Sequence, residues 1–208
     1  MLFVLTGSSA AGKTAVLSGL AASVADLEPH DVDELGVPRG ASRRWRQEAT
    51  EAWTRRVIAS AARDTLIASQ TPLGEWLAVP SATALEGIAV CLLDVSDQIR
   101  AERLRRRREA IAPGRIQLRH LLAWAAWHRS HAADPQWRQD VIQQGAWERM
   151  RWERWRHWQR GDHRWDVLRL DTSVAPVEDT VEQLARWIVE RRSAQSAGTL
   201  ALSGRWWT

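Results

Sequence analysis

The residues best suited to chemistry form one string near the start of the chain, Gly7-Ser8-Ser9-Ala10-Ala11-Gly12-Lys13-Thr14. The string fits the pattern G-x-x-x-x-G-K-[ST], in which successive backbone N–H groups surround phosphate oxygens. Lys13 is the one lysine among 29 basic residues. A compact ammonium reaches between phosphate oxygens, which a broad guanidinium does poorly. We therefore expect all eight residues to bind ATP, with Lys13 on the β- and γ-phosphates and the Thr14 hydroxyl on Mg²⁺.

Two carboxylates follow at the end of a predicted second strand, in Asp31-Val32-Asp33. Alternate residues of a strand point to the same side, so the side chains of Asp31 and Asp33 share one face. One carboxylate would orient magnesium-bound water, and the other would accept the proton of an attacking hydroxyl. The competing interpretation is a solvated acidic turn in which an aspartate caps the next segment.

Strands and helices alternate along the rest of the chain. Apolar runs and turn residues predict strands at 2–6, 28–32, 64–70, 88–94 and 164–170. Helices are predicted at 14–25, 42–63, 97–108, 117–160 (interrupted near 134–135 and 145) and 177–191. This alternation predicts an α/β protein with a parallel sheet covered on both faces. Ligands of such sheets bind at the carboxyl ends of the strands.

Length and composition favour one domain, residues 1–192, followed by a loose tail at 193–208. Apolar residues make up 45% of the chain and charged residues 26%, as in ordinary globular proteins. No run approaches the ~20 apolar residues of a membrane span. The first residues carry no basic leader, and the single cysteine, Cys91, suits a reducing compartment. We expect a cytoplasmic protein with no membrane partner.

The middle of the chain is rich in arginine and tryptophan. Residues 100–165 hold 16 Arg against 7 Asp and Glu, a net charge of +9, which leaves −5 for the remainder of a chain whose total is +4. Such a segment fits either nucleic acid or a flap over a triphosphate. Seven tryptophans crowd it: Trp124, Trp127, Trp137, Trp147, Trp152, Trp155 and Trp158. They form either the packed core of a helical cap or an aromatic lid over a planar substrate or base.

Several short motifs together resemble a known family. They are the N-terminal glycine loop, the Asp-x-Asp of the second strand, Leu93-Asp94 before the run Glu102–Arg107, and Leu170-Asp171-Thr172-Ser173 before the last helix. Over residues 1–192 the chain resembles the small P-loop phosphotransferases. These include shikimate kinase, gluconate kinase, nucleoside monophosphate kinases and chloramphenicol phosphotransferase, and the loop is especially similar to the last. It also resembles uncharacterised actinobacterial ATPases of the AAA type.

The resemblance implies a fold and several roles. The fold would be a three-layer P-loop NTPase sandwich with strand order 2-3-1-4-5 and a helical, Trp- and Arg-rich lid at about 109–163. Asp33 would be the general base and Asp31 the magnesium partner. Arg103 and Arg107 would reach the phosphates, and Asp171 and Thr172 would lie near the adenine.

The loop after the third strand departs from the family, because Ser69–Glu75 has neither the glycine pair nor the acidic residue found there in many of these enzymes. Gln70 and Glu75 are candidate substrate ligands only because this loop should face the same crevice. Arg115, beyond the Pro113-Gly114 break, is expected in the flap. There it would supply charge to the transferring phosphoryl group on closure.

These features predict a kinase that moves the γ-phosphoryl group of Mg-ATP to the hydroxyl of a small molecule. A nucleoside, an antibiotic-like metabolite or a sugar acid would each fit as acceptor. One alternative is an NTP-binding switch that acts on a protein partner. The other is a nucleic-acid end kinase, the less favoured assignment.

Overall fold

A sheet of parallel strands forms the centre of the computed structural model, which describes residues 1–60, 64–110 and 118–208. Within these residues the strands are β1 (Leu2–Thr6), β2 (Leu27–Asp31), β3 (Asp64–Ala68), β4 (Ile88–Asp94) and β5 (Val167–Asp171). Their order is β2-β3-β1-β4-β5, and every neighbouring pair is parallel. The predicted fold class and the strand order 2-3-1-4-5 are confirmed.

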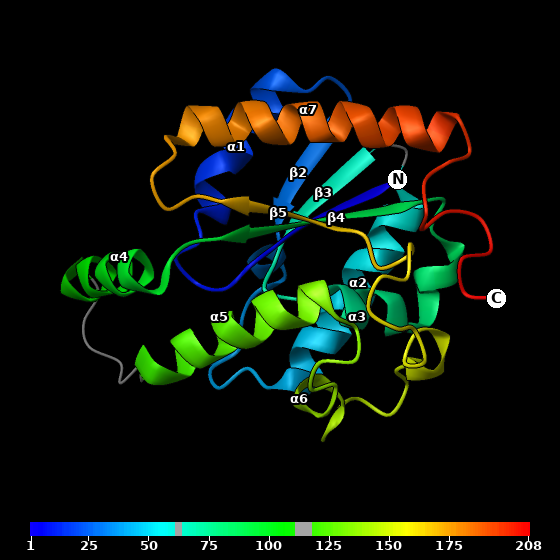
Figure 1. Cartoon of the computed structure of the whole chain (residues 1–208), viewed down its shortest axis with the longest axis horizontal. Coiled ribbons are helices and arrows are strands. Elements are labelled where there is room, and N and C mark those ends of the chain that lie inside the picture. Colours follow the sequence, from blue (N-terminus) through cyan, green and yellow to red (C-terminus); the bar gives the residue numbers. More distant parts are fainter. Residues whose placement is uncertain (61–63, 111–117) are drawn as a thin grey trace.

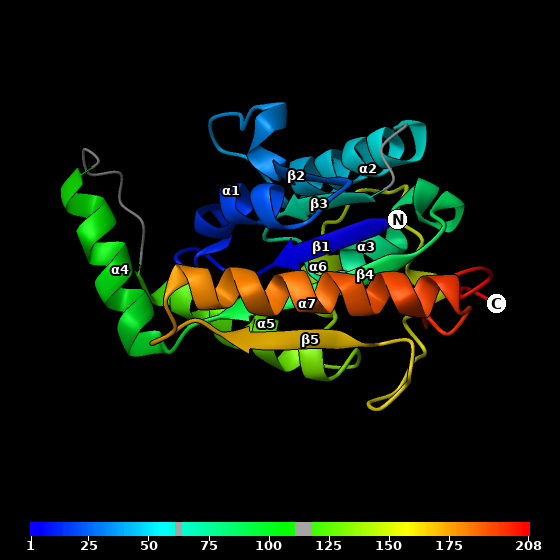
Figure 2. The ribbon, with the colours of Figure 1, turned by 90° about the horizontal axis from the view of Figure 1, so that it is seen from above.

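Helices cover both faces of the sheet (Figure 1). On one face lie α1 (Lys13–Ser23) and α7 (Val177–Ser196). The opposite face carries α2 (Arg43–Ala59), α3 (Leu73–Ala78), α5 (Leu118–Ala133) and α6 (Asp140–Gln143), with 3-10 turns at Val32–Leu35, Pro80–Ala84 and Trp152–Arg154. The remaining helix, α4 (Asp97–Ala110), projects away from the body of the molecule (Figure 2). None of the described helices is long and apolar enough to cross a bilayer.

The central strands are buried on both faces, as their continuous apolar sequences require. All five residues of β1 are buried, and they alternate between two cores. Leu2 and Val4 pack with α2, α3 and the tryptophan-rich segment. Phe3 and Leu5 pack with α1 and α7. The first strand is thereby fixed in the middle of the protein, with the glycine loop at its carboxyl end.

The tryptophan-rich segment is a packed layer of the core. Trp127, Trp147, Trp155, Trp158 and Trp165 are buried in the same cluster as β1. Three of the indole N–H groups donate to backbone carbonyls: Trp127 to Arg138 (3.1 Å), Trp155 to Gly74 (2.8 Å) and Trp165 to His131 (3.0 Å). Of the two interpretations, the described residues therefore support the packed cap.

The long helix predicted at 117–160 is wrong beyond Ala133. After α5 the chain forms the short α6 and a 3-10 turn, and 144–166 is otherwise irregular. Pro135 lacks the N–H that a continuing helix needs, and Gly145 has a φ of +67°. Tryptophan side chains, which bond to carbonyls across the core, stabilise this irregular path.

The loose tail predicted at 193–208 also differs from the structure. Helix α7 continues to Ser196, and Leu200, Leu202 and Trp206 are buried. The backbone N–H of Ile88 donates to the Leu202 carbonyl at 3.0 Å. Ser203 forms an antiparallel bridge with Gly87. Three buried apolar side chains explain the order of a segment that reads as small and polar.

Replacing one of these side chains should measure how firmly the C-terminal segment is held. We expect Trp206→Ala to lower the free energy of unfolding by about 3 kcal/mol, because it leaves a cavity beside Trp158. Arg205→Ala, at the exposed neighbouring position, should change stability little. Urea unfolding of both variants tests this, and equal stability of the two would mean that the segment is loose.

Two histidines of α5 are buried and give the fold a pH dependence. Burial lowers the pKa of His131 to about 4, against 6.5 for an ordinary histidine, and it lowers the pKa of His128 well below that value. Between pH 6.5 and 4 the unfolded chain binds a proton at position 131 that the folded chain does not. Stability is therefore fully present above pH 6.5 and is lost as the pH falls.

For His131 alone we expect the free energy of unfolding to be about 2 kcal/mol lower at pH 5 than at pH 7.5. His131→Gln should reduce the difference between the two pH values by about that amount. His163→Gln is the control, because the His163 side chain is 81% exposed. Chemical unfolding of the three proteins at both pH values gives the answer, and an equal pH dependence in all three would contradict the assignment.

Candidate functional site

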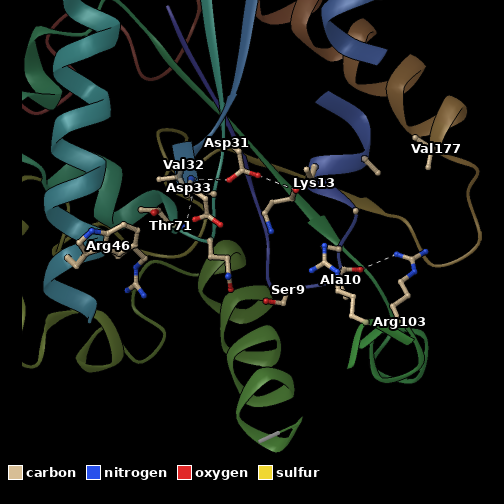
Figure 3. A pocket seen from close by; sticks show the side chains of 18 residues that line it. Ser9, Ala10, Lys13, Asp31, Val32, Asp33, Arg46, Thr71, Arg103 and Val177 are labelled. Carbon is tan, nitrogen blue, oxygen red and sulfur yellow. Dashed lines mark hydrogen bonds between the residues drawn. The ribbon is translucent and has the colours of Figure 1, made fainter. Parts of the chain in front are cut away.

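A cavity of about 600 Å³ opens at the carboxyl ends of β1, β2 and β3 (Figure 3). It is the largest of the cavities found among the described residues. Its walls come from the glycine loop, the ends of β2 and β3, and helices α2, α4 and α7. The lining residues are Ser9, Ala10, Ala11, Gly12, Lys13, Thr14, Ala15, Asp31, Val32, Asp33, Trp45, Arg46, Ser69, Gln70, Thr71, Arg103, Arg107 and Val177.

The glycine loop wraps one side of this cavity. A Cβ on Gly7 would lie 2.3 Å from the Leu93 carbonyl oxygen, so glycine is required there for close packing on β4. Gly12 (φ +93°) and Ala10 (φ +66°) adopt left-handed backbone conformations. Six of the eight predicted residues line the cavity. Gly7 and the buried Ser8 instead form the base of the loop.

Lys13 folds back into the loop, where its ammonium donates to the carbonyls of Gly7 (2.7 Å) and Ser8 (3.3 Å). Burial lowers its pKa from 10.5 to about 8; the nearby Asp31 acts in the opposite direction, and Arg100 lowers the pKa further. A cation so poorly solvated gains more from an incoming phosphate than an exposed lysine would.

A short polar contact connects the loop to β2. The Thr14 hydroxyl donates to Oδ2 of Asp31 at 3.1 Å, and both residues line the cavity. Magnesium prefers oxygen ligands and usually keeps several waters, being held by one or two protein groups plus substrate phosphates. Among the described residues no three His, Cys, Asp or Glu side chains gather into a metal cluster. A hydroxyl and a carboxylate beside a phosphate loop fit Mg²⁺.

Asp33 lies in the cavity by a different geometry from the one predicted. Strand β2 ends at Asp31, and Val32–Leu35 is a 3-10 turn that Asp31 caps by accepting from the Asp33 N–H at 3.1 Å. The alternation argument was therefore wrong, and the capping interpretation holds for Asp31, yet both carboxylates line the cavity. Desolvation first and Asp31 second raise the pKa of Asp33, while Lys13 opposes them.

The arginines of α4 have distinct positions. Arg103 donates to the Ala10 carbonyl at 3.2 Å and to the Thr172 carbonyl at 2.7 Å, so it supports the glycine loop as well as lining the cavity. Arg107 lines the cavity from an exposed position. Arg115 lies outside the described residues.

Sequence reasoning missed Arg100 and misjudged Asp94, which it assigned to a turn or cap. Arg100 is buried and donates to the Ser9 carbonyl (2.6 Å) and to Asp94 (2.8 Å). Asp94 also pairs with Arg129 (3.2 Å) and Arg169 (2.7 Å). A buried carboxylate with three arginines braces the glycine loop from behind.

Two residues expected near the adenine do not line the cavity. The Thr172 hydroxyl is buried and contacts the carbonyls of Ala11 and Asp94, both at 3.0 Å. Asp171 is exposed and accepts from the Ser173 N–H at 2.8 Å, which caps the turn after β5. Val177, at the start of α7, provides the wall on this side instead.

The opposite end of the cavity lies beyond Lys13 in Figure 3, where Asp33, Thr71 and Arg46 gather. Gln70 lines this part, as predicted. Glu75 does not: its side chain is fully buried and bonds to Arg46 at 2.7 Å through both carboxylate oxygens. Trp45 and Arg46, which line the wall, were missed. The only sequence signal was their place on a helix directly after the second strand.

Comparison with known proteins places this arrangement among familiar structures. The sequence matches no protein-family model and no curated protein. A sugar kinase from Janibacter sp. HTCC2649 is similar in structure, with TM-score 0.53, 16% identity, and 90% of this chain and 94% of the other covered. A gluconokinase from Sinorhizobium meliloti 1021 gives 0.53 and 16%, covering 93% and 96%. Kti12 from Chaetomium thermophilum, in complex with ADP-AlF3, gives 0.56 and 16%, covering 91% and 98%.

The chain has a P-loop kinase-like fold. At 16% identity this likeness concerns the fold. In the P-loop kinase-like fold of this chain, the glycine loop, the Thr14–Asp31 contact and Asp33 all face one cavity.

Proposed function

We propose that the protein is an ATP-dependent phosphotransferase that moves the γ-phosphoryl group of Mg-ATP to the hydroxyl of a small molecule. One observation carries the proposal. A single cavity of about 600 Å³ contains the phosphate loop with Lys13, the Thr14–Asp31 pair and, beyond them, the separate carboxylate of Asp33. That cavity has room for a second substrate beside a bound nucleotide.

Each residue has a defined role in this reaction. The loop amides and Lys13 hold the β- and γ-phosphates, with Arg103 and Arg107 on the side of α4. Thr14 and Asp31 would hold Mg²⁺, which supplies charge neutralisation on the phosphate oxygens when bound. Asp33 accepts the proton of the acceptor hydroxyl while its oxygen bonds to the γ-phosphorus. The bond between that phosphorus and the β–γ bridging oxygen breaks, and ADP leaves.

The names of similar structures agree with this assignment. A sugar kinase and a gluconokinase share the fold over nine-tenths of the chain. Both names denote phosphoryl transfer to a small hydroxylated compound. The low identity leaves the acceptor of this protein to be found.

An acceptor screen tests the proposal directly. The protein with Mg-ATP is mixed with single sugars, polyols, nucleosides and antibiotic-like compounds, and ADP formation is recorded for each. We expect ADP formation to rise sharply with a compound that mass spectrometry then shows to carry one added phosphoryl group. Binding of Mg-ATP with no stimulated turnover by any compound would contradict the assignment.

A nucleic-acid end kinase is the second candidate, because α4 projects from the body and exposes Arg105, Arg106 and Arg107. Oligonucleotide binding that weakens steeply with salt, together with end phosphorylation, would favour it. The protein-directed switch has less support, since the tryptophans proposed for its contact surface are mostly buried in the core.

A further inference from the structure

The acceptor half of the cavity has an unusual balance of charge, and its consequence rests on the proposed function. This half lies beyond Lys13 and is lined by Asp33, Trp45, Arg46, Gln70 and Thr71. Arg46 is its one cationic side chain among the described residues. Whether Arg46 attracts anions depends on what else it contacts.

A buried carboxylate neutralises Arg46. Its Nε donates to Oε2 of Glu75 and its Nη2 to Oε1, both at 2.7 Å. The Glu75 side chain is fully buried, so water screens this pair little. Bidentate arginine–carboxylate pairs are strong and geometrically specific. Together the two residues carry no net charge toward the cavity.

Glu75 cannot turn away from Arg46 without breaking a larger network. Gln47 Nε2 donates to Glu75 Oε1 at 2.8 Å and to the Ile142 carbonyl at 3.1 Å. The Gln47 carbonyl oxygen accepts from the Trp147 N–H at 2.8 Å. The guanidinium of Arg46 also lies 5.1 Å from the centre of the Trp124 ring. Both ends of the pair are thus fixed by the packed layer beneath the sheet.

Two polar groups remain free for an acceptor. Nη1 of Arg46 makes no hydrogen bond within the described part of the chain, although the residue lines the cavity. The Asp33 carboxylate likewise has neither ion pair nor hydrogen bond to any described side chain or backbone group. An anionic acceptor would therefore meet an unpaired carboxylate and no uncompensated cation. A hydroxyl or ring oxygen, in contrast, can accept from Nη1 while a second hydroxyl donates to Asp33.

The wall between these groups is flat and apolar. Trp45, on the first turns of α2, is partly buried against the core and still lines the cavity. An indole face offers contact area to the flat side of a ring and keeps a fixed position at low entropy cost.

We propose that the acceptor is an uncharged, hydroxylated ring compound, and that Glu75 excludes anionic acceptors by neutralising Arg46. One face of the ring lies on Trp45. An oxygen of the acceptor accepts from Arg46 Nη1, and the reacting hydroxyl donates to Asp33. Glu75 is a positioning residue that acts through Arg46 and touches no substrate.

Matched pairs of compounds test the preference without requiring turnover. Glucose and glucuronate, inositol and quinate, and thymidine and thymidylate are each titrated by calorimetry into the protein loaded with Mg-ADP. In the best-bound pair the neutral member should bind at least about tenfold more tightly. Glu75→Gln leaves Arg46 with an uncompensated charge, so the ratio should shift toward the charged member by about tenfold. A wild-type preference for charged members, an unchanged ratio in Glu75→Gln, or no binding by any compound overturns the inference.

Two controls separate this effect from damage to the fold. Glu51→Gln removes another buried carboxylate, which pairs with Arg55 at 2.6 Å away from the cavity, and should leave the ratio unchanged. Trp45→Ala should weaken binding of the neutral compound about tenfold at constant Mg-ADP affinity. Trp137→Ala, at a position 47% exposed, should not.

The outcomes also distinguish this inference from the proposed function. Tight neutral binding with no phosphorylated product would overturn the phosphotransferase and leave the charge preference standing. Transfer to a carboxylate-bearing compound in preference to its neutral counterpart would confirm the kinase and overturn the inference.

Discussion

Lys13→Ala is expected to lower kcat/KM for ATP by about 10³-fold, the upper range for removal of one preorganised charged donor from a phosphoryl-transfer site. The ammonium lies in the phosphate loop, bonded at 2.7 Å to the Gly7 carbonyl, and its low pKa shows how little solvent stabilises it. Only bound phosphate can supply the missing counter-charge. Coupled assay of ADP formation, with nucleotide affinity measured separately by calorimetry, tests this.

Lys13→Arg should rescue little of the loss, because the planar guanidinium is too broad for a site shaped by Gly7 and Gly12. Arg105→Ala is the control, since Arg105 is exposed on α4 and does not line the cavity. ATP binding by the wild type should also weaken as the pH rises through about 8, where the free ammonium loses its proton. Undiminished ATP use by Lys13→Ala would contradict the assignment of the loop.

The parts of the site that sequence predicted are those determined by local backbone chemistry. Glycines and a lysine at fixed spacing between a buried strand and a helix specify one loop geometry, and the structure has it. The order of the strands followed from the resemblance to P-loop phosphotransferases, and the parallel sheet confirms it.

The parts that sequence misjudged depend on contacts across long separations. Glu75 belongs to Arg46, 29 positions away, and Thr172 bonds to Ala11, 161 positions away. Neither partner can be identified from a local pattern. A polar residue that follows a strand is equally suited to bind a ligand or to satisfy the backbone of a neighbouring loop, and only the folded structure distinguishes them.

Long-range packing also explains the C-terminal segment and the tryptophans. Leu202 and Trp206 are isolated apolar residues in a polar stretch, so no periodicity announces their burial. Trp155 packs on Gly74, where a Cβ would lie 2.4 Å from the indole. Such complementary contacts fix an irregular backbone that propensity assigns to helix.

Asp33→Asn is expected to lower kcat by about 10²–10⁴-fold while Mg-ATP affinity changes little, because an amide cannot accept the proton of the acceptor hydroxyl. Asp31→Asn is its counterpart two residues away. Since Asp31 contacts Thr14 and Asp33 does not, this variant should weaken the magnesium-dependent affinity for nucleotide instead.

The pH dependence separates a general base from a mere ligand of the acceptor. Desolvation and Asp31 raise the pKa of Asp33 above 3.8, so it stays protonated to a higher pH than an ordinary aspartate and is inactive as a base below that point. Wild-type kcat/KM should therefore fall on the acid side through the raised pKa, and the residual activity of Asp33→Asn should lack this limb. Because His128 and His131 also titrate in acid, folding at each pH must be verified by tryptophan fluorescence. Full transfer activity in Asp33→Asn, or an unchanged acid limb, would assign the proton to another group.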